Sequence, residues 1–580
     1  MGMAETQYDN ASQRLSPTAH IYNIGVKEAK RRALITLANK NRKFASLHKK
    51  GIIHIHDLET YKHTYNCLQM DVLKGFPLER MSKYSEFRKI TEIFYHYRNL
   101  IVKLGHEQSG GIGFPNFDEE ISVLFERLSI ADETNNLQIL KDSIESFIDW
   151  SNEAHERICQ YSFYVTLNLG LSTSKIGRYV TKCAIEYFMR TSLDVIKPNI
   201  IFKIKKGVNF LPEDPNYDMF CLAVKCTCKK MIPTYLLFDS NVNEMYDPWK
   251  VAIMGCRTKV VANIFGESRS IGRANIDYIS INLPRISLEI ELATLKLKKN
   301  IDKNIIKFKK KWTEIANSVK DILLDRYRVL LERKVNDFPC NYKYNLWDQD
   351  FKTANSLEEI FKHGTLSVGF IGLSEAVEIL TGEKYYTSAA NHARAIDIVR
   401  HMREVVDGFK DKHQLNFTLL ASSGELISGR FPEEDKKKFN NNIINKGYYT
   451  NSFHVDVDSG MHPIKKIQYE GPFHEYANGG CITYVEFSSA PINNTDAIME
   501  VIDAGNTNGI NYLGINFPLD RCRSCGETGT FDGCPKCGGN NIHRVRRVSG
   551  YLEDLEFFTV GKKAEVAYRK PNDRINNRGE

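Results

Sequence analysis

The stretch Arg547-Val548-Ser549-Gly550-Tyr551 lies close to the C-terminus of a chain of 580 residues. A lone glycine in a loop usually needs no explanation beyond a backbone angle that other residues avoid. Here a cluster of four cysteines precedes the glycine, and the last of them, Cys537, stands ten residues before Arg547. These surroundings indicate a small C-terminal module that holds Gly550 in place.

The four cysteines form two knuckles, Cys522-x2-Cys525 and Cys534-x2-Cys537. Four thiolates at this spacing converge on one ion, and zinc is the natural occupant because they complete its closed tetrahedral site. The alternatives are an iron–sulfur cluster or redox dithiols. A closed zinc site has no open position for water, so it predicts a structural role and leaves the catalysis to other residues.

The composition is that of a soluble globular protein, with 42% hydrophobic and 26% charged residues. The net charge of +8 is mild for this length and suits an anionic small substrate better than a nucleic acid. The sequence lacks both a run of roughly 18 apolar residues and a secretion signal, so we expect a cytoplasmic protein without membrane attachment. Thirteen unevenly placed cysteines favour metal binding or catalysis over a disulfide framework.

Apolar runs between turn residues recur along most of the chain. They predict strands at 52–57, 164–171, 200–204, 234–238, 276–283, 366–371, 416–420, 452–457, 482–487 and 510–517. Segments of helical period lie between them, and they include 26–49, 174–190, 286–333 and 387–407. This alternation predicts an α/β architecture with a largely parallel sheet or barrel. After Asp520 the composition becomes rich in Cys and Gly, which marks the start of the C-terminal module.

Two further segments carry candidate chemistry. Met254-Gly255-Cys256-Arg257-Thr258 brackets a thiol with small residues just before a predicted strand, although a free cysteine is most often a small buried hydrophobe. His54, His56 and Asp57 allow a metal site, since alternate residues of a strand share one face. Without further ligands, a hydrogen-bonded structural pair of histidines is the favoured interpretation.

Taken together, these motifs resemble one known family. The pentapeptide around Gly550 resembles the signature of the glycyl radical enzymes. The segment around Cys256 resembles the thiyl-radical loop of the anaerobic ribonucleoside-triphosphate reductases. Other segments agree with that family in the same order along the chain, at 51–57, 66–67, 108–111, 272–275, 282–285, 449–454 and 479–480.

The resemblance extends from about residue 45 to about residue 565 and implies a fold. The expected fold is a ten-stranded α/β barrel of the glycyl radical enzyme type, made of two five-stranded halves, with a small C-terminal zinc-binding module. We therefore expect an N-terminal extension without an ATP-cone at 1–45, a catalytic barrel at 46–520, and a zinc-binding and glycyl radical domain at 521–580.

The resemblance also implies roles for five residues in reducing a ribonucleoside triphosphate. Gly550 would store a radical, and Cys256 would receive it and remove the 3′ hydrogen of the ribose. Cys67 would supply hydrogen as the 2′ hydroxyl leaves as water. Asn275 would hydrogen-bond the ribose hydroxyls. Met254 matches the subgroup that uses formate as the final reductant.

Further binding partners follow from the same resemblance. Thr450, Asn451 and Ser452 would hold the substrate phosphates, with help from backbone N–H groups. A separate radical S-adenosylmethionine enzyme with an iron–sulfur cluster would activate the glycine. We also expect a homodimer, nucleotide effectors at its interface, and no direct contact with nucleic acid. Residues of the effector site are not assigned, and the triphosphate follows from the resemblance alone.

Two alternatives remain at this point. Other glycyl radical enzymes, the acyltransferases and dehydratases, share the motif around Gly550, but the acyltransferases use adjacent cysteines and the chain has no Cys-Cys pair. The second alternative is a zinc ribbon that binds nucleic acid through Arg544, Arg546 and Arg547. It would leave the preceding 520 residues without a function.

Overall fold

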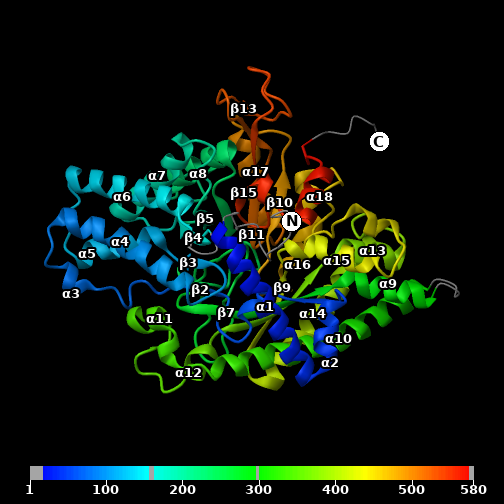
Figure 1. Ribbon diagram of the computed structural model, residues 1–580. Helices are drawn as coiled ribbons and strands as arrows, with labels where there is room; N and C mark the ends of the chain where they lie inside the picture. The colour runs from blue at the N-terminus through cyan, green and yellow to red at the C-terminus, as the bar shows by residue number, and fades with distance from the viewer. Residues whose placement is uncertain (1–16, 156–161, 295–299, 574–580) are drawn as a thin grey trace.

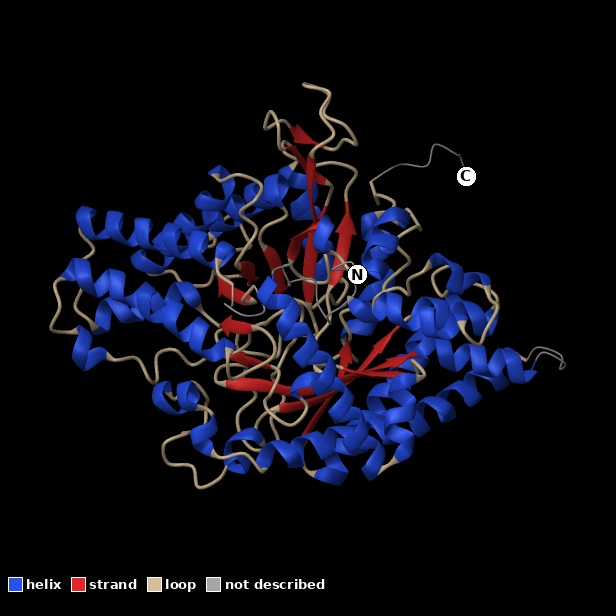
Figure 2. Ribbon diagram, in the orientation of Figure 1, coloured by secondary structure: helices blue, strands red, loops and turns tan. Residues whose placement is uncertain are grey.

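Strands form the centre of the protein and helices surround them in the computed structural model, which describes residues 17–155, 162–294 and 300–573 (Figures 1 and 2). The central sheet has eleven strands within these residues. They are β1 (Ile53–Ile55), β2 (Cys67–Gln69), β3 (Ile112–Phe114), β4 (Val165–Leu169), β5 (Asn199–Ile204), β6 (Thr234–Leu237), β7 (Arg273–Asn282), β8 (Thr365–Ile371), β9 (Asn416–Ala421), β10 (Thr483–Glu486) and β11 (Tyr512–Asn516).

Ten of these strands close into a barrel of two halves. Strands β2 to β6 are parallel neighbours and form one half. Strands β7, β8 and β9 are parallel to one another, as are β10 and β11, and Leu420 at β9 forms a parallel bridge with Gly480 just before β10. The halves join antiparallel at β2–β7 and at β6–β11, while β1 pairs only with β7. The predicted ten-stranded barrel with five-stranded halves is confirmed.

Helices connect most of the successive barrel strands and surround the barrel, whereas β6 and β7 are joined by a loop (Figure 2). The helices of the first half are α1 (Pro17–Lys40), α2 (Arg42–Lys49), α3 (Leu78–Met81), α4 (Glu86–Gly105), α5 (Phe117–Arg127), α6 (Thr134–Glu153), α7 (Lys175–Arg190) and α8 (Tyr217–Lys230). Those of the second half and the C-terminus are α9 (Leu283–Thr294), α10 (Ile301–Leu331), α11 (Pro339–Tyr344), α12 (Leu357–Phe361), α13 (Leu373–Thr381), α14 (Ala389–His413), α15 (Leu426–Lys436), α16 (Pro463–His474), α17 (Thr495–Thr507) and α18 (Val560–Tyr568).

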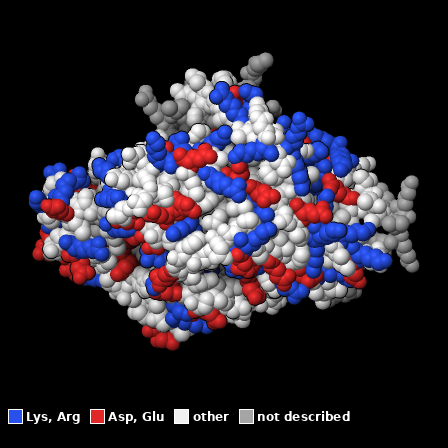
Figure 3. Space-filling model, turned by 90° about the horizontal axis from the view of Figure 1, so that it is seen from below, with Lys and Arg blue, Asp and Glu red and all other residues white. Residues whose placement is uncertain are grey.

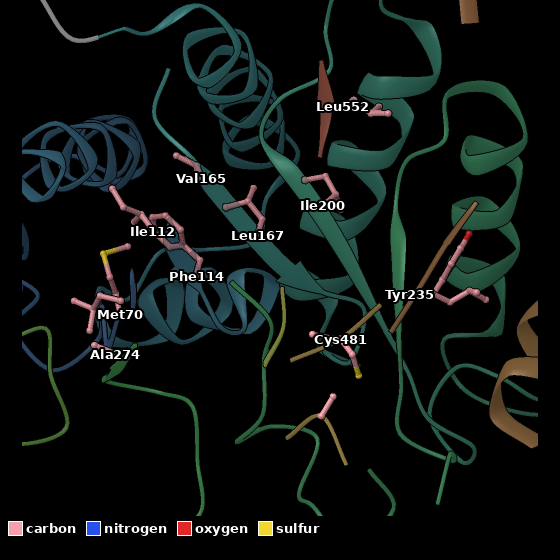
Figure 4. Close-up of a cluster of buried hydrophobic side chains, with 14 of the residues drawn as sticks. Met70, Ile112, Phe114, Val165, Leu167, Ile200, Tyr235, Ala274, Cys481 and Leu552 are labelled. Atoms are coloured by element: carbon pink, nitrogen blue, oxygen red, sulfur yellow. The ribbon is translucent and has the colours of Figure 1, made fainter. Parts of the chain in front are cut away.

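The two faces of the barrel strands carry different side chains. In β8, Leu366, Val368 and Phe370 belong to the main hydrophobic core. Ser367, which points to the opposite face, exchanges a 2.8 Å hydrogen bond with Thr418 of β9. Figure 4 shows the same core on the first half, where side chains of β3, β4 and β5 pack together. The alternation buries apolar side chains beneath the helices and leaves polar groups inside the barrel.

A second sheet forms the C-terminal module at the top of Figure 1. Its strands are β12 (Leu519–Cys522), β13 (Thr528–Gly529), β14 (Ile542–Arg547) and β15 (Leu552–Asp554), in the order β13-β12-β14-β15. Arg547 pairs with Leu552, so residues 548–551 form the tip of the β14–β15 hairpin. Gly550 therefore lies at a hairpin tip that extends from the module toward the barrel.

Some sequence predictions differ from the structure. The strand predicted at 452–457 is wrong, because Ser452 adopts φ 42° and the N–H of Val455 donates to the carboxylate of Glu470 instead of a neighbouring strand. Strands β2 and β3 were not predicted. The helix predicted at 286–333 is observed as α9 and α10, and residues 295–299 lie outside the described part. The first sixteen residues of the predicted extension also lie outside it.

The surface carries charges of both signs. On the face drawn in Figure 3, Lys and Arg side chains are interspersed with Asp and Glu side chains. This mixture agrees with the small net charge of the sequence. Among the described residues, every helix is too short or too polar to cross a bilayer.

Candidate active site

The loop between β6 and β7 places Cys256 at its tip. Met254 and Thr258 exchange two backbone hydrogen bonds of 3.1 Å each, which closes a tight turn over the three residues between them. Gly255 makes this turn possible with φ 58°, a conformation that side chains disfavour. The thiol is thus held on a narrow loop, as the sequence predicts.

Glycines allow other segments to approach this loop closely. A β-carbon added to Gly111, just before β3, would lie 2.9 Å from the Cα of Gly255. One added to Gly550, at φ 146°, would lie 2.5 Å from the Cα of Cys256. Gly480 makes a similar approach to the backbone of Arg257. Any side chain at these positions would push the segments apart, so glycine is required on steric grounds.

The structure brings Cys67 and Cys256 together. Both line one pocket, with Asp57, Tyr278 and Glu425 among its other walls. Cys67 begins β2, and its Sγ accepts a 3.0 Å hydrogen bond from the N–H of Gly111. Two cysteines that lie 189 positions apart in the sequence therefore face the same space.

Both thiols are held in their protonated form. Burial raises the pKa of Cys67 to about 12. Burial, and then the neighbouring charge of Glu425, raise the pKa of Cys256 well above its usual value. A protonated thiol carries the hydrogen atom that radical transfer moves, whereas a thiolate does not. The pocket therefore suits hydrogen-atom chemistry better than nucleophilic attack.

Sequence reasoning missed the residues that contact the Cys256 thiol. Its Sγ donates to Glu425 Oε1 at 3.6 Å, and the hydroxyl of Tyr551 donates to Glu425 Oε2 at 2.7 Å. Tyr164, just before β4, donates to the Tyr551 hydroxyl at 2.8 Å. The only signal in the sequence was that Glu425 closely follows the strand predicted at 416–420.

A second hydrogen-bonded chain orients Cys67. Its thiol donates to Asn66 Oδ1 at 2.7 Å. Asn66 Nδ2 donates to Asp57 Oδ2 at 2.7 Å, and Ser109 Oγ donates to the same oxygen at 2.7 Å. Asp57 is thus part of the pocket. His56 stacks on Tyr278 with ring centroids 3.9 Å apart and exchanges a 2.9 Å hydrogen bond with Ser280, which fits a structural role for this histidine.

Two other predicted residues are close to Cys67. Met254 packs with Cys67 and Val260 in one buried cluster. Asn275 of β7 is the strand partner of Cys67, and its amide nitrogen donates to Ser367 Oγ at 2.8 Å. The amide of Asn275 is therefore already engaged inside the barrel.

Thr450, Asn451 and Ser452 lie where two helices begin. Thr450 donates to Glu375 Oε1 from its backbone N–H at 2.7 Å and from its hydroxyl at 2.8 Å. The N–H of Leu373, the first residue of α13, donates to the Ser452 carbonyl. Asn451 Oδ1 accepts from the N–H of Gly424, directly before Glu425. The segment thus borders the pocket wall but does not itself line the pocket.

The four clustered cysteines of the C-terminal module converge. Their sulfur atoms all lie within 4.8 Å of one another, with 3.6 Å between Cys522 and Cys537 and 3.5 Å between Cys525 and Cys534. A tetrahedral zinc site with Zn–S bonds of about 2.3 Å needs sulfur atoms roughly 3.8 Å apart. The geometry fits one metal ion.

The fold and the site together define an α/β-barrel enzyme with a thiol loop inside the barrel and a metal-binding module at its C-terminus. Residues 9–571 match the model of the family described as anaerobic ribonucleoside-triphosphate reductase. The chain belongs to this family.

Individual relatives agree with this assignment. The chain is 30% identical over 566 residues to the anaerobic ribonucleoside-triphosphate reductase of Escherichia coli K12, covering 90% of this chain and 77% of that protein. It is 28% identical to that of Enterobacteria phage T4, covering 90% of each. A structure of the anaerobic ribonucleotide reductase from Thermotoga maritima with dATP and CTP has a TM-score of 0.70 at 15% identity, covering 96% of this chain and 92% of that one.

Proposed function

We propose that this chain reduces ribonucleoside triphosphates to 2′-deoxyribonucleoside triphosphates for DNA synthesis by glycyl and thiyl radical chemistry. The observation that carries the proposal is the close approach of the Gly550 backbone to Cys256, which lines one pocket together with Cys67. Removal of a hydrogen atom from the Gly550 α-carbon leaves a radical that both neighbouring amides delocalise. The S–H bond of Cys256 then breaks as the C–H bond of Gly550 forms again.

The thiyl radical on Cys256 would remove the 3′ hydrogen of the ribose. The 2′ hydroxyl would take up a proton and leave as water, and Cys67 would give a hydrogen atom to C2′. Cys256 would finally give a hydrogen atom back to C3′, which restores its thiyl radical for return to Gly550. Formate would supply the two electrons and be oxidised to carbon dioxide. The contact of Met254 with Cys67 supports its predicted link to formate. Asn275 would bind the ribose hydroxyls once substrate displaces part of its present hydrogen bonding.

Substrate phosphates would lie near Thr450, Asn451 and Ser452. The beginnings of α13 and α15 are close by, so their backbone N–H groups and positive dipole ends favour an anion there. The Glu375 carboxylate opposes an anion at Thr450, and bound phosphate would have to replace its two hydrogen bonds.

Zinc would occupy the site of Cys522, Cys525, Cys534 and Cys537 as a structural ion. The sulfur geometry supports it, and the four ligands leave no position for substrate. When bound, zinc would connect β12 to the long loop before β14 and so stabilise the sheet that carries the Gly550 hairpin. The chain would comprise the N-terminal extension at 1–45, the catalytic barrel at 46–520 and this zinc-binding module at 521–580.

The remaining partners are also proposals. The activating enzyme would be a radical S-adenosylmethionine protein with an iron–sulfur cluster. A Thermotoga maritima structure holds dATP in a site named the specificity site, which supports a nucleotide effector here. The chain would form a homodimer and bind its effectors at the dimer interface. The cytoplasm is the expected location.

The arginines that favoured a nucleic-acid-binding ribbon are engaged within the protein. Arg547 is buried, Arg546 forms a 2.7 Å ion pair with Asp520, and Arg544 donates to the Asp532 carbonyl at 3.0 Å. These contacts support the enzymatic function over the ribbon.

Anaerobic activation tests the proposal. The activated protein should give an electron paramagnetic resonance doublet, which collapses toward a singlet in deuterated water, and should form deoxynucleotide when formate is present. Cys256→Ser should keep the doublet and lose the product, whereas Gly550→Ala should lose both. A doublet that persists in Gly550→Ala would refute the assignment of the radical. Turnover with a dithiol and no formate would refute the role of Met254.

A further inference from the structure

Two buried arginines contact the peptide groups on either side of Gly550. Arg257 Nη2 donates to the Ser549 carbonyl at 2.9 Å, and Arg547 Nη1 donates to the Gly550 carbonyl at 3.1 Å. Arg257 is 1% exposed and Arg547 is 2% exposed. Each carbonyl that flanks the α-carbon of Gly550 therefore accepts a hydrogen bond from a positive charge that is shielded from water.

Arg257 is fixed by the barrel as well as by the hairpin. Its Nη1 donates to the carbonyls of Ala421 and Ser422, at the end of β9, at 3.4 and 3.5 Å. Because Arg257 follows Cys256 directly, one residue connects the thiol loop, β9 and the glycine hairpin. The planar guanidinium suits this task because its donors point in fixed directions.

Arg547 is fixed from a different side of the barrel. Its Nε donates to Asn516 Oδ1 of β11 at 2.8 Å, and its Nη2 donates to the carbonyl of Met231, before β6. All three nitrogen atoms of this guanidinium thus have acceptors within the protein. A surface turn does not require so many hydrogen bonds to one side chain. They hold the positive charge of Arg547 in a defined position beside Gly550.

These two hydrogen bonds would act on a Gly550 radical in opposite senses. The unpaired electron spreads from the α-carbon onto the Gly550 carbonyl oxygen, and Arg547 favours that shift by stabilising negative charge on the oxygen. The Gly550 nitrogen also donates electron density to the α-carbon. Arg257 opposes this donation because it draws the nitrogen lone pair toward the Ser549 carbonyl. Charge-assisted hydrogen bonds are strong and act at low local dielectric, so both effects count here.

We propose that Arg257 and Arg547 form a guanidinium clamp that sets the electron distribution of the Gly550 radical and thereby the balance of hydrogen transfer with Cys256. The clamp rests on the proposed function, since it requires a radical on Gly550. Arg547 stabilises the stored radical, and Arg257 keeps it reactive enough to take the hydrogen atom of the thiol. Both arginines are positioning residues in this role.

Paramagnetic resonance of the activated full-length protein tests the clamp. The splitting by the α-proton reports the spin density on the α-carbon. Arg547→Lys should widen the doublet, because less spin reaches the carbonyl oxygen. Arg257→Lys should narrow it, because the nitrogen donates more freely. Arg546→Lys is the matched control, because Arg546 is next to Arg547 in the sequence but contacts Asp520 and the Leu519 carbonyl. The radical doublet of this variant should have the same splitting as that of the wild type.

A measurement on the unaltered protein covers the case in which a variant does not fold. With 15N-labelled arginine, electron–nuclear double resonance of the wild-type radical should detect coupled guanidinium nitrogens. A wild-type protein without any doublet would overturn the proposed function and the clamp together. Two results would overturn the clamp alone. The first is a normal wild-type doublet without coupling to arginine nitrogen, and the second is a splitting in Arg257→Lys and Arg547→Lys that equals that of the wild type.

Discussion

Replacing Gly111 by alanine tests whether the close packing around the thiol loop determines activity. The new β-carbon would lie 2.9 Å from the Cα of Gly255. Carbon atoms pack best at roughly 3.5 Å or more, so the loop must move by about 0.6 Å. Such overpacking costs about 1–3 kcal/mol of stability. The backbone N–H that donates to Cys67 is retained, so only the position of the loop changes.

The expected effect is on turnover and not on radical storage. Since a displacement of about 1 Å can cost roughly 100-fold in rate, the shorter shift should lower product formation per radical about tenfold. Spin quantitation and a deoxynucleotide assay on the same sample give this ratio. Gly408→Ala is the control, because that glycine lies in α14 with open space around it. Turnover per radical within twofold of wild type in Gly111→Ala, or an equal loss in Gly408→Ala, would show that the steric reasoning is wrong.

Three other changes have defined outcomes. Cys256→Ala should leave the radical content unchanged and abolish turnover. Single-turnover product formation in this variant would show that Cys256 does not carry the radical from Gly550 to the substrate. Cys534→Ala should release one zinc per chain and expose 519–547 to proteases, whereas Cys183→Ala, a buried cysteine outside the cluster, should keep the metal. The hydrogen bond from His543 Nε2 to Asp554, at 2.8 Å, raises the pKa of His543. Its stabilisation is therefore complete below the unfolded pKa near 6.5 and is lost as pH rises through the higher folded pKa. Proteolysis of the module should accordingly increase as the pH is raised above that folded pKa in the wild type but not in His543→Gln.

The strand pattern was sufficient for the long strands and the α/β class, because those strands are continuous apolar runs between turn residues. The ten-stranded barrel followed from the resemblance to the family. The strand pattern was insufficient for β2 and β3, which have three residues each and owe their pairing to neighbours already in place. The segment 452–457 has strand-like composition, but the left-handed Ser452 and the carboxylate of Glu470 take its backbone out of any sheet. Short elements of this kind depend on tertiary contacts that no local pattern contains.

The candidate site shows the same division. Glycine and cysteine positions are readable because few residues can replace them, as Gly550 and Cys256 illustrate. Glu425 carries no such signal, and its contact with Tyr551 joins residues 126 positions apart. Arg257 likewise could be recognised only once the hairpin was seen beside it.

The β14–β15 hairpin gives the metal module a mechanical role. β14 pairs with β12 next to Cys522 and runs without interruption to Arg547, a span of six residues or about 20 Å. Only four residues separate β14 from β15, so Gly550 can move little relative to these two strands. Gly550 therefore lies at the end of a stiff hairpin, and it can leave or enter the barrel only if the β14–β15 hairpin moves as a rigid body.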